Sequence, residues 1–235
     1  MITIKNKNLK EYLEIILSKS IDNITEEDIN SIKSVTIRGD MIEDDNYKID
    51  TSDLKLFKNL DNITITDGLV TIFNMKDILE ANPKSIILNR CAIDDDNTLS
   101  ALEGIENLTL IKCFNENYKF LNRLNNLKSL SIVEPESEAE VDIGDIPKGI
   151  INIAIQRGII DNEEKLKDLT SVEILNLLWT NLTDGIIDTV NQMPSLKELY
   201  VTDRHDCTSL RSDVTVYHDL IRFTFDTDDE PQKNK

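Results

Sequence analysis

The sequence predicts an α/β solenoid in which about nine short parallel strands stack side by side. A pattern of three apolar residues, Φ-x-x-Φ-x-Φ, recurs along the chain, with its middle position at residues 35, 63, 86, 108, 130, 153, 175, 199 and 223. The spacing varies only between 22 residues, from 86 to 108, and 28 residues, from 35 to 63. A single unit of this length cannot bury its own apolar edge, so successive units must stack to form a continuous core.

The composition agrees with a core built from aliphatic side chains. The 235 residues include 33 Ile and 27 Leu, whereas Phe, Trp and Tyr together make up only 5%. Within each unit the alternation Φ-x-Φ has the period of a strand with one buried face. Upstream of a strand, apolar residues recur at intervals of three, as in Leu121, Leu124 and Leu127. This spacing predicts a short helical or 3₁₀ return segment behind each strand.

Residues 1–34 are predicted to form an N-terminal helical cap that shields the first unit. One apolar stripe of an amphipathic helix is formed by Leu9, Tyr12, Leu13, Ile16 and Leu17. Residues 25–28, Thr-Glu-Glu-Asp, have the form of an N-cap followed by acidic residues in the first turn. A second short helix should therefore begin at this point.

Residues 35–226 form the predicted solenoid, and residues 227–235 form a disordered acidic tail. The tail has no apolar residue that could anchor it to the core. Between the fifth and sixth predicted strands, the acidic segment 134–142 interrupts the rhythm of the repeat. We expect this segment to be a loop on the convex side, because the phase of the repeat continues beyond it.

Two units show the sequence of the repeat most fully. Residues 86–93, Ile-Ile-Leu-Asn-Arg-Cys-Ala-Ile, and residues 108–114, Leu-Thr-Leu-Ile-Lys-Cys-Phe, fit the frame L-x-x-L-x-L-x-x-N/C-x-L. In this respect the chain resembles the leucine-rich repeat family, and its spacing is similar to the short repeats of bacterial internalin-like proteins. The resemblance implies a horseshoe with parallel strands on its concave face. Most units lack the family's asparagine, and Pro135, Gly158 and Thr180 stand in its place, so we expect irregular turns.

Charge and cysteine content restrict the partners and the compartment. The 26 Lys and Arg against 44 Asp and Glu give a formal net charge of −18, which disfavours nucleic acid and anionic membrane surfaces as partners. No stretch approaches the ~20 apolar residues of a membrane span, and the N-terminus lacks the apolar core of a secretory signal. Three scattered cysteines are too few for a disulfide framework. We therefore expect a cytoplasmic protein that is a monomer.

The candidate protein-binding residues follow from the repeat frame, since residues between and just after the buried strand positions face the concave side. They are Arg38, Arg90, Lys112, Arg157, Leu178, Trp179 and Tyr200. Together they would form a locally positive groove that ends in aromatic residues and suits an acidic protein surface. Arginine and aromatic residues often dominate the energetics of protein interfaces. The alternative is that these are ordinary solvated strand positions, with Trp179 tucked under a neighbouring loop.

Other candidate groups favour structure over chemistry. Cys91 and Cys113 both occupy the N/C position of the repeat, where a small buried side chain lines the turn. Residues 204–207, Arg-His-Asp-Cys, place a base beside a thiol, but neighbouring residues on an extended segment point in different directions. Acidic clusters lack the spacing of a calcium loop, and no zinc, P-loop or dinucleotide motif is present. We predict no metal and no cofactor.

The function predicted from the sequence is that of a non-enzymatic module that binds a partner protein on its concave sheet. One alternative treats the acidity as functional and predicts an immunity-type inhibitor of a basic toxin or enzyme. A second alternative is an enzyme or enzyme-activating subunit that uses Arg90 or Arg157 to contact an anionic group. A third is a structural protein that self-associates through its C-terminal strand.

Overall fold

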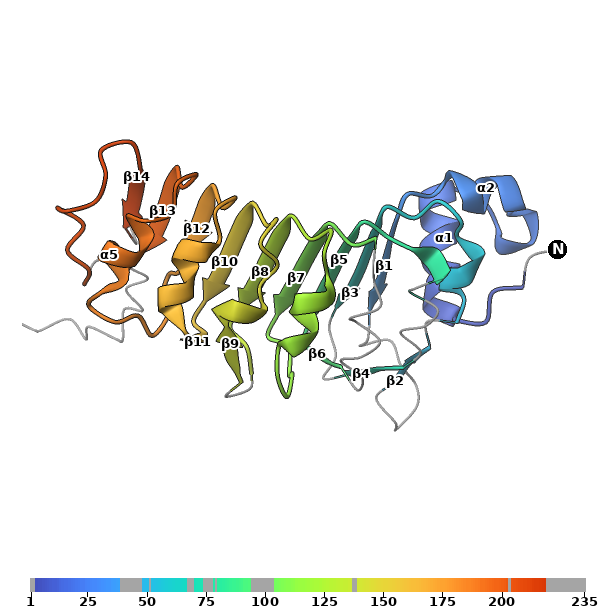
Figure 1. Ribbon diagram of the computed structural model, residues 1–235. Helices are drawn as coiled ribbons and strands as arrows, with labels where there is room; N and C mark the ends of the chain where they lie inside the picture. Colours follow the sequence, from blue (N-terminus) through green and yellow to red (C-terminus); the bar gives the residue numbers. More distant parts are fainter. Residues whose placement is uncertain are drawn as a thin grey trace, which may run out of the picture.

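The computed structural model describes residues 3–38, 48–50, 52–66, 70–73, 78, 80–93, 104–136, 139–202 and 204–218. Its dominant feature is a sheet of nine parallel strands, which run side by side along the length of the molecule (Figure 1). In spatial order these are β1 (Ser34–Arg38), β3 (Asn62–Thr66), β5 (Ser85–Asn89), β7 (Asn107–Ile111), β8 (Ser129–Val133), β10 (Asn152–Gln156), β12 (Ile174–Asn176), β13 (Glu198–Val201) and β14 (Thr215–His218). The predicted solenoid with nine parallel strands is confirmed.

The strand register follows the apolar repeat. The middle apolar residue of each unit pairs with that of the next, from Val35 with Ile63 to Leu175 with Leu199. The ninth strand differs from the prediction, because Leu199 pairs with Val216, and the predicted centre, Phe223, lies outside the described residues together with the predicted tail. The interval from 199 to 216 is short because the described residues between β13 and β14 contain turns and no return helix.

Short helices and small sheets carry the chain back behind the main sheet (Figure 1). The helical returns are η2 (Leu54–Leu56), η3 (Lys119–Arg123), η4 (Ile143–Asp145), η5 (Glu163–Asp168) and α5 (Ile186–Val190). A three-stranded sheet contains β2 (Lys48–Asp50), β4 (Val70–Phe73) and β6 (Cys91–Ile93), and a two-stranded sheet contains β9 (Glu140–Asp142) and β11 (Ile159–Asp161). The end of the acidic segment is therefore strand rather than loop, because Val141 is fully buried and pairs with Ile160.

The N-terminus folds into α1 (Lys7–Leu17), η1 (Ile21–Asn23) and α2 (Glu26–Ser31), which lie at one end of the main sheet (Figure 1). Leu9 and Leu13 of α1 are buried against the first repeats, but Ile16 is 43% exposed, so the predicted apolar stripe is narrower than expected. Leu17, the last residue of α1, still packs against the core, so the stripe is interrupted at Ile16 and does not end there.

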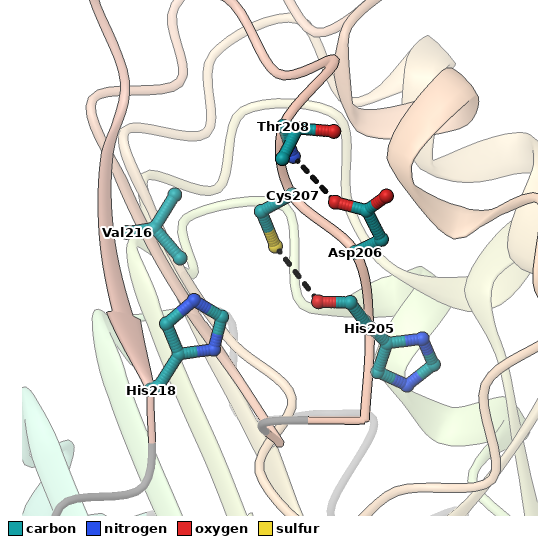
Figure 2. A pocket seen from close by; sticks show the side chains of 6 residues that line it. All are labelled: His205, Asp206, Cys207, Thr208, Val216 and His218. Atoms are coloured by element: carbon teal, nitrogen blue, oxygen red, sulfur yellow. Dashed lines mark hydrogen bonds between the residues drawn. The ribbon is translucent and has the colours of Figure 1, made fainter.

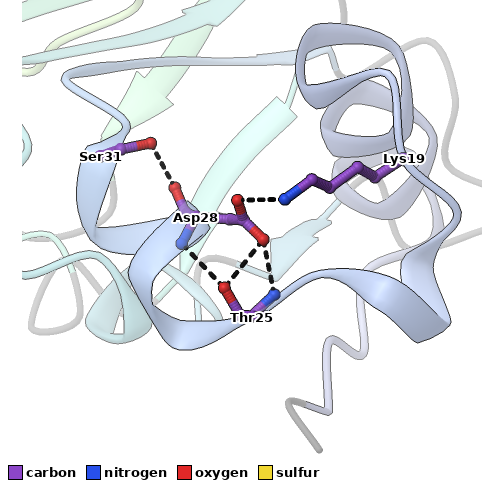
Figure 3. A network of polar contacts seen from close by, with 4 residues as sticks. All are labelled: Lys19, Thr25, Asp28 and Ser31. Carbon is purple, nitrogen blue, oxygen red and sulfur yellow. Dashed lines mark hydrogen bonds and ion pairs between the residues drawn. The ribbon is translucent and has the colours of Figure 1, made fainter.

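Helix α2 starts after Thr25, as the sequence predicts, and the N-cap is a full capping box. The Thr25 hydroxyl accepts from the Asp28 N–H at 3.2 Å, and an Asp28 carboxylate oxygen accepts from the Thr25 N–H at 2.9 Å (Figure 3). The other Asp28 oxygen accepts from Lys19 Nζ at 2.6 Å, which ties α2 to the end of α1. These contacts hold the pKa of Asp28 at about 2, with the Lys19 hydrogen bond as the largest cause.

Candidate protein-binding surface

The surface available for binding is the side of the main sheet that faces away from the core. We call it the open face and define it by the strand residues that alternate with the buried ones. Its first column is Ser34, Asn62, Ser85, Asn107, Ser129, Asn152, Ile174, Glu198 and Thr215. Its second column is Thr36, Thr64, Ile87, Thr109, Ser131, Ala154, Asn176, Tyr200 and Tyr217. Its third is Arg38, Thr66, Asn89, Ile111, Val133 and Gln156, and Leu178 continues this column just past the end of β12.

The open face carries very few charges for a protein with a net charge of −18. Arg38 at one end and Glu198 near the other are the only charged residues among its three columns. The strands between them present serine, threonine, asparagine and aliphatic side chains. The acidic residues of the described chain therefore lie mainly on the turns and return segments, and the open face itself is close to neutral.

The character of the open face changes along the solenoid. Near β1 and β3 it is polar, whereas at β13 and β14 it is aromatic. The rings of Tyr200 and Tyr217 stack with centroids 4.5 Å apart and planes 14° apart. This contact exists because β14 pairs with β13 in a register that sets Tyr217 directly beside Tyr200.

A second row of side chains lies just beyond the strand ends. We call it the corner row, and it consists of Arg90, Lys112, Glu134, Arg157 and Trp179. All five have left-handed backbone conformations, with φ between 49° and 62°. Such conformations are costly for residues other than glycine. Here each backbone N–H donates to the next unit: Arg90 to the Ile111 carbonyl at 2.8 Å and Trp179 to Thr202 Oγ1 at 3.0 Å, for example.

Glu134 interrupts the basic residues of the corner row. Its carboxylate pairs with Lys112 at 3.1 Å and also with Arg157, one unit to either side. The Lys112 hydrogen bond is the largest cause that lowers the pKa of Glu134, and the charge of Arg157 acts in the same direction. Sequence reasoning overlooked Glu134, although its place in the repeat is the same as that of Arg90 and Arg157.

The structure divides the predicted binding residues between two neighbouring surfaces. Arg90, Lys112, Arg157 and Trp179 lie in the corner row, and Arg38, Leu178 and Tyr200 lie on the open face. Trp179 is 50% exposed, so its indole is not tucked under a neighbouring loop. Two large exposed aromatic residues, Trp179 and Tyr217, therefore lie near the C-terminal end of the sheet.

Inside the turns of the repeat, three buried side chains each contact a backbone carbonyl of the preceding unit. The thiol of Cys113 donates to the Leu88 carbonyl at 3.2 Å, and Thr180 Oγ1 donates to the Ile155 carbonyl at 2.7 Å. Cys91 lies 3.8 Å from the equivalent carbonyl, that of Ile65. In each case the acceptor carbonyl belongs to the preceding repeat unit, where it is that of the second buried residue in the strand of the main sheet. Burial raises the pKa of the Cys91 thiol to about 12 and that of Cys113 to about 11.

A cavity of about 510 Å³ lies beside β14 and is lined by His205, Asp206, Cys207, Thr208, Val216 and His218 (Figure 2). His205 Nε2 accepts from Arg204 Nε at 3.1 Å, and the imidazole of His205 points away from the Cys207 thiol. Burial is the main cause that raises the pKa of Cys207, so the reactive thiolate is disfavoured. Among the described residues, no group of three or more His, Cys, Asp and Glu is arranged to hold a metal ion.

Comparisons with known proteins bear on the fold. No known family profile matches the sequence, and no protein of established annotation matches it either. The fold is similar to internalin C2 of Listeria monocytogenes, with a TM-score of 0.67 and 15% identity over 90% of this chain and 92% of that one. An internalin F of the same species has a TM-score of 0.50 and 14% identity over 92% and 95% of the two chains.

A leucine-rich repeat protein of Leptospira interrogans is also similar, with a TM-score of 0.52 and 15% identity over 84% of this chain and 46% of that one. The nine-stranded parallel sheet and these likenesses define the class of fold: the protein is a leucine-rich repeat solenoid. The overall arrangement of its repeats is similar to that of the two internalins. None of the helices in the described part of the chain combines the length and the hydropathy that a membrane span requires.

Proposed function

We propose that the protein is a non-enzymatic leucine-rich repeat module that binds another protein on the open face of its main sheet. The observation that carries this proposal is the near-absence of charge on the open face, although the whole chain has a net charge of −18. Protein interfaces are depleted of charged residues at their centres and enriched in aromatic residues and arginine. Tyr200, Tyr217 and Trp179 supply the aromatic residues, and Arg90 supplies an exposed arginine at the rim.

The architecture also favours tight binding for an entropic reason. The backbone of the open face is held in a nine-stranded sheet, so little conformational freedom is lost when a partner docks. Most of its side chains are serine, threonine and asparagine, which have few rotatable bonds to immobilise. The surface is therefore preorganised along its whole length.

The alternatives from the sequence receive less support. An inhibitor of a basic toxin that binds here would need acidic side chains, and the open face presents only Glu198. An enzyme centred on Arg157 would need an unpaired cation, whereas Arg157 pairs with Glu134.

We also propose a reducing compartment such as the cytoplasm, because all three cysteines are free thiols.

The proposal is tested by photo-crosslinking from both sides of the solenoid. A photoreactive phenylalanine analogue is placed at Thr109 or Ser131 on the open face, and at Lys167, an exposed residue of the return helix η5, as a matched control. In extracts of the native cells, we expect one defined protein to be crosslinked from Thr109 and Ser131, and not from Lys167. This capture should be lost when Trp179 is replaced by Ala.

Crosslinking that does not favour the open-face positions Thr109 and Ser131 over Lys167 would contradict the proposal. Equal labelling from both faces would indicate nonspecific association, and labelling from Lys167 alone would place the binding surface on the return segments. Retention of the crosslink in the Trp179→Ala variant would exclude the indole as a contact, and a Tyr217→Ala variant then tests the other exposed aromatic residue.

A further inference from the structure

A cluster of three residues at the C-terminal end of the open face has the chemistry of a cation site. Glu198 and Tyr200 are two positions apart on β13 and therefore project from the same face of the sheet. The Tyr200 hydroxyl donates to Glu198 Oε2 at 2.9 Å. On the neighbouring strand, Tyr217 stacks against Tyr200 with the ring centroids 4.5 Å apart. The cluster thus combines one carboxylate with two ordered aromatic rings.

The carboxylate of Glu198 has no cation beside it within the part of the chain that the structure describes. Its neighbours across the strands are Ile174 and Thr215, and neither is charged. The nearest lysine in the sequence, Lys197, pairs with Glu173 at 2.8 Å. Tyr200 engages only Oε2, and no other residue that the structure describes donates a hydrogen bond to Oε1, which leaves this oxygen for a donor from a partner.

The aromatic pair adds a second attraction for a cation. Ring faces carry negative potential, and an arginine guanidinium can stack on one such face while its N–H groups reach a carboxylate. Tyr217 is 38% exposed, and stacking on Tyr200 covers only one of its two faces. Stacking also holds both rings in place, so binding a cation costs little further ordering.

We propose that Glu198, Tyr200 and Tyr217 form a binding site for an arginine side chain of the protein partner. This inference rests on the proposed function, since it names a group that the partner must present. Arg38, the other charge of the open face, lies seven strands away, which is roughly 34 Å at about 4.8 Å per strand. The partner should therefore carry a basic residue over β13 and an acidic residue over β1, which sets a single direction of binding.

The test uses a small probe with the intact protein. Nα-acetyl-arginine methylamide is titrated into the protein while NMR follows the ring signals of Tyr200 and Tyr217, and the uncharged citrulline analogue serves as the comparison probe. We expect a saturable shift with the arginine probe only, weakened by added salt. Glu198→Gln and Tyr217→Leu should each weaken binding about two- to fivefold, the range expected for one exposed ion pair or one cation–π contact.

The control variant is Glu106→Gln, which removes an exposed carboxylate just before β7, four strands from β13, and should leave the titration unchanged. Equal binding of the arginine and citrulline probes, or no saturable shift at either tyrosine, would overturn the inference. Glu198→Gln preserves the size and shape of the side chain, so it tests the site even if Tyr217→Leu loosens the edge strand.

The probe titration and the crosslinking experiment can fail independently, so a failure of the cation site is distinguishable from a failure of the proposed function. If the open face crosslinks a protein but the probe does not bind, the cation site is wrong and the binding module stands. If the probe binds and no protein is crosslinked from the open face, the cation site stands and the proposed function is wrong.

Discussion

Replacing Thr180 by valine should destabilise the solenoid, because it removes a hydrogen bond that links two consecutive repeats. Thr180 is 2% exposed, and its hydroxyl donates to the Ile155 carbonyl at 2.7 Å. Valine has nearly the same shape, so the substitution opens no cavity, but it leaves the buried carbonyl without this donor. The expected loss is about 1–3 kcal/mol in the free energy of unfolding, the range for an unsatisfied buried polar group.

The matched variant is Thr180→Cys, since Cys91 and Cys113 occupy the same position in other repeats and contact the equivalent carbonyls. We expect Thr180→Cys to cost less stability than Thr180→Val, because the thiol keeps a weak donor. Urea unfolding measures both, with circular dichroism for the whole solenoid and Trp179 fluorescence for the adjacent corner. Coincident transitions with equal slopes allow the midpoints to be compared as free energies. A valine variant as stable as the cysteine variant would refute the argument.

Three further predictions concern the charged groups and the thiols. Replacing Glu134 by Gln should change the free energy of unfolding by less than about 1 kcal/mol, because the ion pairs of Glu134 are partly exposed. Urea unfolding measures this difference between the wild type and the variant, and the difference should vanish at high salt. Asp28 has a folded pKa of about 2 against an ordinary 3.8, so its contribution to stability should be fully present above pH 3.8 and lost as the pH falls through about 2. Urea midpoints of the wild type and of Asp28→Asn should therefore converge over that interval, and a constant difference would contradict the assignment. At pH 8 a thiol reagent should leave Cys91 and Cys113 unmodified in the folded protein, because both thiols are buried and their pKa values are about 12 and 11. The same reagent should label both cysteines after unfolding in urea. Rapid labelling in the native state would show that the turns open.

Much of the fold could be predicted because its signals are local. The alternation of apolar residues decides which strand side chains are buried, and the strands from β1 to β13 follow it in register. The capping box at Thr25 and Asp28 was predictable for the same reason, since its partners are three residues apart. The stripe on α1 was predicted less well, because the position of the core edge decides whether Ile16 is covered.

The candidate site was less accessible to sequence reasoning. The periodicity places Arg90, Lys112 and Arg157 in equivalent positions, but it does not show that Glu134 stands among them and pairs with two of them. It also predicts the ninth strand at Phe223, whereas the structure forms β14 at residues 215–218. The Tyr200–Tyr217 stack follows from that register and could not be foreseen from the repeat.

The sequence by itself determined the solenoid and the aliphatic core, because burial of a repeated apolar pattern depends only on the spacing of neighbouring residues. The tertiary structure decided the distribution of charge, namely a nearly neutral open face with Arg38 and Glu198 near its two ends. The packing of successive repeat units brings residues about 20 positions apart into contact, so Glu134 pairs with the residues in the equivalent positions of the two adjacent units. Those contacts depend on which strands become neighbours and in which register, and this is settled only when the whole core is packed.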